Sequence, residues 1–208
     1  MKSGREMRKY SLRQPFDKTI FRIRSTISGL ISWHRTVFWR LLGMRVGTGT
    51  RLPPVHVTWP HQVALGAGCM LEHNISFKYD GPWRKGPSIV IGNHVFIGAG
   101  CEFNIHAKIS VGDETMISAG CRFIDSDHGF SDRSLSMFRQ AGRKEPIAIG
   151  SDVWIGANAI VLRGVSIGRG AIVAAGAVVA HSIPEFEVWG GVPAKKLSVR
   201  PNTGDAPP

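Results

Sequence analysis

The chain has 208 residues, 25 glycines and a formal net charge of +11, and this length is enough for one sizeable core. The charge is concentrated at the start, because residues 1–51 contain twelve Lys or Arg and two acids, while the other 157 residues carry a net charge of only +1. No uninterrupted apolar run follows the basic start, and the most apolar stretch, residues 171–180, is too short to span a bilayer. These features argue against a secretory or membrane-spanning protein, and we expect a cytoplasmic location.

Residues 1–45 are predicted to form a basic amphipathic helical segment. Apolar and basic side chains alternate over residues 16–42, which indicates one or two amphipathic helices with Gly29 or Gly43 as a break or stop. This segment is suited to cap the open end of the domain that follows. It is also suited to peripheral contact with an anionic membrane, such as the inner membrane surface, where each basic side chain adds roughly 1 kcal/mol. No recognition module accompanies the charge, so we expect no nucleic-acid partner.

A six-residue period dominates residues 46–200. The first residue of each unit is aliphatic or aromatic, the second is repeatedly glycine, and the fifth is small or β-branched. A period of six fits short strands separated by sharp corners, so three units close one triangular coil, and the coils must stack to bury their apolar faces. We predict an all-β solenoid of about six coils, followed by a disordered tail at residues 201–208. The predicted coils begin near Val46, Leu65, Ile91, Val111, Ile149 and Ile167.

Two long insertions, at residues 78–88 and 129–146, interrupt the repeat. The three cysteines, Cys69, Cys101 and Cys121, each occupy the fifth position of a unit, where a free cysteine behaves as a small buried hydrophobe. Their odd number and the lack of C-x-x-C spacing favour a reducing compartment over a disulfide framework. The histidines lack the spacing of a ligand set, so we expect no metal.

His128 is the strongest catalytic candidate. The unit that begins at Phe123 has Asp127 at its fifth position instead of a small apolar residue, and His128 follows at the start of the second insertion. A polar residue that breaks the core pattern indicates a site rather than packing. A neutral imidazole, with an ordinary pKa of about 6.5, suits the removal of a proton from a hydroxyl group at cytoplasmic pH. Asp125 or Asp127 is placed either to orient this imidazole or to cap a turn.

Three segments resemble the hexapeptide-repeat acyltransferases. They are PIAIGSDVWIGANAIVLRGVSIG at residues 146–168, VWGGVPAK at residues 188–195 and DSDHGF at residues 125–130. The combination is most similar to the sugar and polysaccharide O-acetyltransferase branch related to maltose and galactoside acetyltransferases. The resemblance implies a left-handed parallel β-helix, which is an exception to the right-handed crossover rule, and a homotrimer with active sites in clefts between subunits. It also implies acetyl-CoA as the co-substrate.

The same resemblance implies roles for single residues. His128 matches the catalytic histidine of the family. Asn104 matches the asparagine that contacts the acceptor and stabilises the tetrahedral oxyanion, a role that suits an aimed amide donor. Ala157 and Ala175 match small residues beside the pantetheine arm, and Lys195 matches a cation for the phosphates of coenzyme A.

We therefore predict an acetyl-CoA-dependent O-acetyltransferase that modifies a sugar hydroxyl, in bacterial surface polysaccharide or glycolipid biosynthesis, with His128 as general base. A xenobiotic or amino-acid acetyltransferase on the same scaffold is the alternative, and a solenoid without catalytic activity is a third possibility. Aromatic and basic residues in the second insertion suit a sugar or glycan acceptor. The same insertion is equally suited to stabilise a trimer as an arm.

Overall fold

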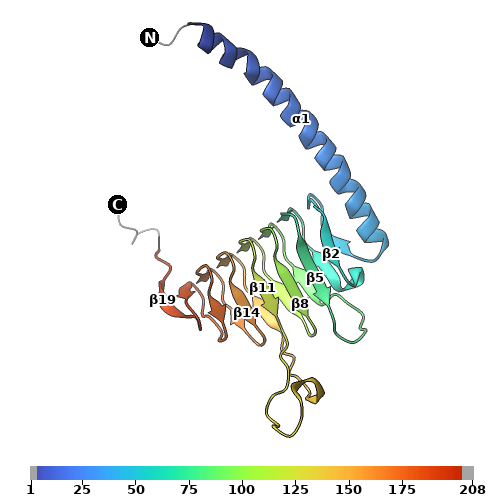
Figure 1. The fold of residues 1–208 in the computed structure, drawn as a ribbon, viewed down its shortest axis with the longest axis vertical. Coiled ribbons are helices and arrows are strands. Elements are labelled where there is room, and N and C mark those ends of the chain that lie inside the picture. Colours follow the sequence, from blue (N-terminus) through green and yellow to red (C-terminus); the bar gives the residue numbers. More distant parts are fainter. Residues whose placement is uncertain (1–3, 203–208) are drawn as a thin grey trace.

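The computed structural model describes residues 4–202, with side chains described for residues 18–24 and 26–202. One long helix, α1 (Gly4–Leu41), precedes a prism of short strands, and Figure 1 shows these strands stacked side by side in successive coils. Apart from its first two residues, the tail predicted at residues 201–208 lies outside the described residues.

Three parallel sheets form the faces of the prism within residues 4–202. The first sheet contains β1 (Arg45–Val46), β3 (Val63–Leu65), β6 (Ile89–Ile91), β9 (Ile109–Val111), β12 (Ile147–Ile149) and β15 (Ser166–Ile167). The second contains β4 (Met70–Leu71), β7 (Phe96–Ile97), β10 (Met116–Ile117), β13 (Trp154–Ile155), β16 (Ile172–Val173), β18 (Glu187–Gly190) and β19 (Lys195–Val199). The third contains β2 (Val55–Val57), β5 (Ile75–Tyr79), β8 (Glu102–Ile105), β11 (Arg122–Ile124), β14 (Ile160–Leu162) and β17 (Val178–Val179). Two 3-10 turns, η1 (Pro60–Gln62) and η2 (Met137–Arg139), lie in connections.

The predicted fold class, a left-handed parallel β-helix, is confirmed. In the first sheet each predicted coil start pairs with the next one, so that Val111 lies opposite Ile91 on one side and Ile149 on the other. The final strand, β19, is the exception to the parallel pattern, because it pairs with β18 in the antiparallel direction.

The interior is an apolar column built from equivalent positions of successive coils. Phe77, Phe103 and Phe123 stack with ring centroids 5.1 and 4.7 Å apart, and all three side chains are buried. The three cysteines are free and buried, as predicted. A hydrogen bond with the thiol of Cys121, together with burial, raises the pKa of Cys101, so this thiol remains protonated.

Glycine at the second position of a unit lets neighbouring coils approach each other. A Cβ atom added to Gly112 would lie 2.5 Å from the backbone nitrogen of Ser151 in the next coil, too close for any side chain. The Gly112 N–H instead donates to the Ile149 carbonyl at 2.8 Å. This glycine is therefore required for close approach rather than for a positive φ angle.

Helix α1 is continuous through Gly29, so the proposed break at that residue is wrong, and the helix ends before Gly43, which has a φ angle of +96°. A positive φ is the usual conformation of a glycine that terminates a helix. Near its end the helix contacts the first coil through polar groups, since Ser32 Oγ accepts a hydrogen bond from the Leu52 N–H at 2.8 Å. Within residues 4–202, no helix combines the length and the apolar character needed to cross a membrane.

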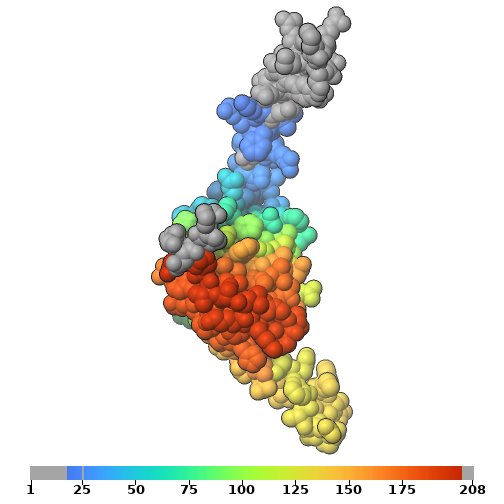
Figure 2. All heavy atoms as spheres, turned by 90° about the vertical axis from the view of Figure 1, so that its left-hand side faces the viewer, coloured from blue at the N-terminus to red at the C-terminus, as the bar shows by residue number. Residues whose placement is uncertain are grey.

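The two insertions leave the prism where they were predicted, with one adjustment. Strand β5 continues to Tyr79, because Tyr79 pairs with Ile105 of β8, so the first insertion begins at Asp80. The second insertion, between β11 and β12, projects away from the coils, on the side opposite to α1 in Figures 1 and 2.

Replacing Gly112 by Ala should lower the free energy of unfolding by about 1–3 kcal/mol, because the added methyl group overpacks two backbones that are hydrogen-bonded to each other. Gly29→Ala is the matched control. Its Cβ would meet nothing within 4 Å, and alanine favours a helix interior by up to about 1 kcal/mol. Urea unfolding followed by circular dichroism measures both. A Gly112→Ala protein as stable as the parent would contradict this account of the repeat.

Candidate active site

His128 lies just after β11, at the corner where the chain passes from the third sheet to the first. Its side chain is exposed and lines a cavity of about 390 Å³ together with Phe130 and Arg143. Residues 80–88 and 106–108 occupy the same corner in the two preceding coils. We call this region the His128 corner, and both long insertions leave the prism there.

The second insertion is anchored by a short antiparallel stem beside His128. The Asp127 N–H donates to the Arg143 carbonyl at 3.0 Å, and the Glu145 N–H donates to the Asp125 carbonyl at 2.9 Å. Arg163, from the next coil, donates to both strands of the stem, through Nε to Asp127 Oδ2 and through Nη1 to Glu145 Oε1, each at 2.6 Å. This guanidinium group therefore holds together the two strands that position His128.

Asp127 is engaged by the stem and does not orient His128. The backbone N–H of Arg143 and then the side chain of Arg163 hold the pKa of Asp127 below its usual range. Because the pKa is lowered in the folded state, this contribution to stability is present above the ordinary value of 3.8 and is lost only as the pH falls further. Asp127 is thus ionised across the neutral range.

Asp125 is fully buried and holds a turn of the preceding coil. Its carboxylate accepts hydrogen bonds from the backbone N–H groups of His106, Ala107 and Lys108 at 2.7, 2.7 and 3.0 Å. The sequence left two roles open for Asp125, to orient the imidazole of His128 or to cap a turn, and in the structure it caps a turn. Among the side chains that the structure describes, none is hydrogen-bonded to the imidazole of His128.

Asn104 lies on β8, opposite Lys78 of β5 and Ile124 of β11. Its Oδ1 atom is buried and has no hydrogen-bond donor within the described part of the chain. Buried polar atoms are almost always paired, so an unpaired one indicates strain or a site that binds a ligand. Close by in the chain, His106 Nδ1 lies 3.1 Å from the hydroxyl oxygen of Ser126.

Ala157 and Ala175 lie at a different corner of the prism, where the chain passes from the second sheet to the third. They occupy equivalent positions in successive coils, and the Gly176 N–H donates to the Ala157 carbonyl at 2.8 Å. Ala175 is exposed, and the space around the Cα of Gly176 is open. We call this the alanine corner, and its small residues leave backbone accessible to an extended ligand.

Lys195 begins β19 and pairs with Gly190, next to the alanine corner. Its neighbours are committed to ion pairs, since Lys196 contacts Glu187 at 2.5 Å and Arg200 contacts Asp152 at 2.7 Å. Within residues 18–202, Lys195 makes no ion pair.

The structure therefore separates the predicted site residues into two groups. In consecutive coils, Asn104 and His128 lie near the C-terminal ends of strands β8 and β11 of the third sheet. Ala157 and Ala175 instead precede the N-terminal ends of strands β14 and β17 of the same sheet. One side of a coil has about six residues, and at about 3.3 Å per residue the two corners of one protomer are on the order of 20 Å apart.

Arg163 is the site residue that sequence reasoning missed. It is the single basic residue between Lys144 and Arg169, in an otherwise regular coil, and this isolation was the available signal. Among the described residues, no three His, Cys, Asp or Glu side chains are grouped in a way that could hold a metal ion.

Two family models match parts of the chain. One, described as bacterial transferase hexapeptide (six repeats), matches residues 146–181, and the other, described as hexapeptide repeat of succinyl-transferase, matches residues 88–122. A probable acetyltransferase of Mycobacterium tuberculosis is 29% identical over 81% of this chain and 58% of its own length. A chloramphenicol acetyltransferase of Escherichia coli is 31% identical over 54% of this chain and 51% of its own length.

The chain thus spans between about half and three-fifths of the length of these curated relatives. A solved structure of a hexapeptide-repeat acetyltransferase from Vibrio cholerae, complexed with acetyl coenzyme A, is similar with a TM-score of 0.60 and 27% identity. That similarity covers 81% of this chain and 78% of the Vibrio chain. In its matched repeats and its fold, the chain is therefore similar to hexapeptide-repeat acetyltransferases.

Proposed function

We propose that the protein is an acetyl-CoA-dependent O-acetyltransferase that transfers an acetyl group to a sugar hydroxyl of a bacterial surface polysaccharide or glycolipid. The observation that carries the proposal is an exposed histidine on a clamped stem, in a cavity of about 390 Å³. Asn104, whose buried Oδ1 atom is unpaired within the described residues, lies on the neighbouring coil. Together, His128 and Asn104 offer a base and a hydrogen-bonding group to one acceptor substrate.

The transfer needs one proton to move twice. The neutral imidazole of His128 takes the hydroxyl proton as the acceptor oxygen attacks the thioester carbon. The side-chain N–H of Asn104 donates to the oxyanion of the tetrahedral intermediate. When the carbon–sulfur bond breaks, the imidazolium returns its proton to the departing thiolate, and the acetyl ester and free coenzyme A are the products.

Acetyl-CoA is proposed to lie along the alanine corner. The pantetheine amides can pair with backbone exposed beside Ala157 and Ala175, and the phosphates require cations. Lys195 suits that role, because it makes no ion pair within residues 18–202, whereas Lys196 is engaged with Glu187. These residues fit the co-substrate by size and charge.

The distance between the two corners favours a homotrimer with shared active sites. A thioester at the alanine corner of one protomer lies too far from His128 of the same protomer, so a second protomer must supply the histidine. The tip of the second insertion exposes Leu135, Met137 and Phe138, and the Phe138 side chain is 96% exposed. An apolar tip that projects from the prism is suited to contact a neighbouring subunit.

A xenobiotic or amino-acid acetyltransferase is the alternative, and the similarity to a chloramphenicol acetyltransferase supports this second function. The two functions differ in the acceptor and not in the donor. Release of free thiol from acetyl-CoA, measured across sugars, lipid-linked glycans, amino acids and chloramphenicol, separates them. Partner binding without any affinity for coenzyme A would instead indicate the non-catalytic solenoid.

We expect His128→Ala to lower turnover roughly 10²-fold to 10⁴-fold in the thiol-release assay, because the general base is lost. Ala175→Trp should abolish transfer by filling the proposed path of the co-substrate. His94→Asn, which replaces an exposed histidine at the corner between the first and second sheets and suits its positive φ angle, is the control and should be fully active. A near-normal rate for His128→Ala would remove it as the base.

Mixing these two inactive variants tests whether the site is shared between protomers. If each site takes His128 from one protomer and Ala175 from the next, random mixed trimers regain both intact groups at about a quarter of their interfaces. Co-expressed His128→Ala and Ala175→Trp chains should therefore recover a corresponding fraction of activity. Mixed trimers that form but stay inactive would place both groups in one protomer and contradict the shared site.

Arg163 is expected to act as a positioning residue. Arg163→Ala should lower kcat on the order of 10-fold to 10²-fold, because a small displacement of the base is costly, and should speed amide hydrogen exchange at Asp127 and Glu145. Arg163→Lys keeps the positive charge but loses the planar guanidinium group that donates to Asp127 and Glu145 at the same time, so it should recover only part of the activity. Arg122→Ala, which breaks a weak 3.9 Å pair with Glu102, is the control. Unchanged exchange in Arg163→Ala would show that the stem does not depend on this residue.

The exposed face of α1 suggests where the enzyme works. Seven of its large apolar side chains recur at helical spacing on one side and are 45–82% exposed; they are Ile20, Ile23, Ile27, Leu30, Ile31, Phe38 and Leu41. Phe21 and Trp33 are also exposed but lie outside this side by the same spacing. The opposite side carries Ser32 and Thr36, which are buried, together with Arg22 and Arg40. The helix therefore caps the first coil with its polar side and directs its apolar side outward.

We propose that this apolar side binds an anionic membrane surface on the cytoplasmic side. Residues 1–51 have a net charge of +10, which attracts anionic lipids and opposes the close approach of three such helices to one another. The apolar side is also wider than a coiled-coil seam, as expected of a helix that lies in the membrane interface.

Replacing Ile27 and Leu30 by Glu should weaken binding to phosphatidylglycerol vesicles about tenfold or more in a sedimentation assay, because the change removes apolar burial and adds like charge. Replacing Ser28 and Gly29 by Glu, outside the apolar side of the same helix, is the matched control for charge and should have a smaller effect. Phosphatidylcholine vesicles should bind little protein. Equal sedimentation of the double variant and the parent would contradict membrane contact through this face.

A further inference from the structure

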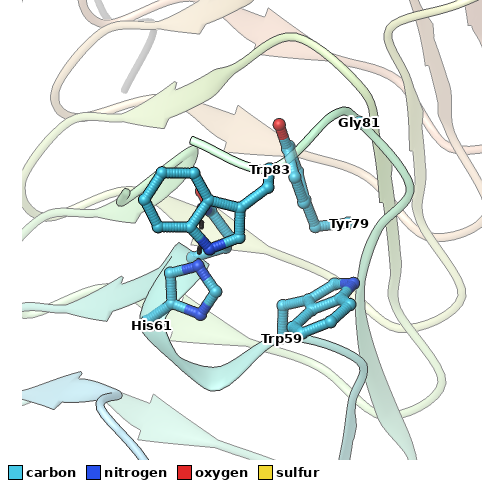
Figure 3. A pocket seen from close by; sticks show the side chains of 6 residues that line it. Trp59, His61, Tyr79, Gly81 and Trp83 are labelled. Carbon is cyan, nitrogen blue, oxygen red and sulfur yellow. Dashed lines mark hydrogen bonds between the residues drawn. The ribbon is translucent and has the colours of Figure 1, made fainter. Parts of the chain in front are cut away.

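The first insertion forms an aromatic pocket that the proposed chemistry does not use. Figure 3 shows Trp59, His61, Tyr79 and Trp83 around one hollow, whose volume is about 70 Å³. The rings of Trp59 and His61 meet edge to face, with centroids 5.9 Å apart, and His61 and Trp83 are tilted at 33°, with centroids 6.5 Å apart. The Trp83 and Trp59 side chains are 78% and 52% exposed, so both indoles offer free surface to a ligand.

The pocket is held by specific hydrogen bonds. The buried Tyr79 hydroxyl donates to the Pro82 carbonyl at 2.8 Å. Gln62 is fully buried, and its Nε2 donates to the Arg84 carbonyl at 2.6 Å and lies 3.0 Å from His61 Nε2. Its Oε1 is buried without a donor within the described part of the chain. This oxygen lies against Gly86, where an added Cβ would be 2.8 Å away. An aromatic hollow lined by a few polar side chains suits a ligand that carries both apolar faces and hydroxyl groups.

The pocket belongs to the same corner as His128. A Cβ added to Gly81 would lie 2.3 Å from the His106 carbonyl oxygen, so the first insertion packs directly on the next coil. His106 in turn contacts Ser126, two residues before His128. Two coil steps of about 4.8 Å separate the insertion from the coil of His128, a total of about 10 Å. One or two sugar units of a glycan are long enough to bridge that distance.

The chemistry of the lining favours a neutral ring over a cation. None of the residues that line the pocket carries a carboxylate, and Arg84 and Lys85 follow Trp83 in the same insertion. The nearest acid in that insertion, Asp80, is paired with Lys78 at 2.6 Å. A cationic ligand would meet like charge here, whereas the apolar face of a sugar can stack on an indole while its hydroxyl groups reach polar atoms at the edge.

We propose that this pocket is a second saccharide subsite, which binds a sugar ring one or two units away from the ring that is acetylated. This inference rests on the proposed function, because it extends the acceptor from a single sugar to an oligosaccharide. The preferred acceptor is then a chain that places one ring on Trp83 and another beside His128.

The test measures binding without acetyl-CoA, by isothermal titration calorimetry of the full chain with maltotetraose, cellotetraose, chitotetraose and their monosaccharides. At least one tetrasaccharide should bind more tightly than its monosaccharide. Trp83→Ala and Trp59→Ala should each weaken that binding about tenfold, as expected for the loss of one stacking contact. Trp154→Ala removes an exposed tryptophan outside the pocket and should bind as the parent does. Thermal unfolding confirms that each variant is folded.

The outcomes separate this inference from the proposed function. In the His128→Ala protein, Trp83→Ala should still weaken tetrasaccharide binding, because the base does not line the pocket. If tetrasaccharide binding depends on Trp83 but the protein releases no thiol from acetyl-CoA, the result supports the subsite and contradicts the proposed acetyltransferase activity. Failure of every tetrasaccharide to bind would overturn the subsite, as would a Trp83→Ala protein with the affinity of the parent. In an active enzyme, an unchanged KM of Trp83→Ala for the tetrasaccharide would overturn it too.

Discussion

The whole prism depends on the close approach of successive backbones at the corners. Where Gly112 meets Ser151, a single added carbon would lie 2.5 Å from a backbone nitrogen, so the coils stack at full hydrogen-bonding contact only because the side chain is absent. That contact fixes the register between coils. With the register fixed, residues at equivalent positions, such as Phe103 and Phe123, must lie directly above one another in the core.

Regular stacking also decides where function can be placed. Strand backbones are hydrogen-bonded to the coils on either side, so extra residues can leave only at corners, and both long insertions do so at the same one. Asp125 stabilises the short turn between the two insertions, because its buried carboxylate accepts hydrogen bonds from three backbone N–H groups of residues 106–108. Polar groups therefore gather at the His128 corner, while the alanine corner stays small and open. A reaction that needs both corners requires more than one protomer.

The sequence was sufficient for the features that depend on local period. The hexapeptide pattern predicted the six coil starts, the buried cysteines and the position of both insertions, because each of these depends on residues a fixed distance apart. It did not predict the clamp of Arg163 on Asp127, which joins residues 36 positions apart through a stem that exists only in the folded chain. The aromatic pocket was missed for the same reason, since Trp59 and Trp83 come from two different connections.

The orientation of α1 follows from the edge that it covers. The first coil has no preceding coil to satisfy its backbone, so the Leu52 N–H and the Val46 carbonyl need polar partners, which Ser32 and the Arg40 guanidinium supply. A wholly apolar helix face could not satisfy these groups, so the face that turns inward carries Ser32 and Arg40 beside Trp39, which packs against the core, and the apolar face turns to the outside. The helix ends at Leu41, and a Cβ added to Gly43, just after it, would lie 3.2 Å from the Cβ of His61. The aromatic pocket therefore begins where α1, the helix proposed to bind the membrane, ends. A saccharide carried on a lipid would then meet the pocket before it reaches His128, and this order links the proposed location of the enzyme to the proposed length of its acceptor.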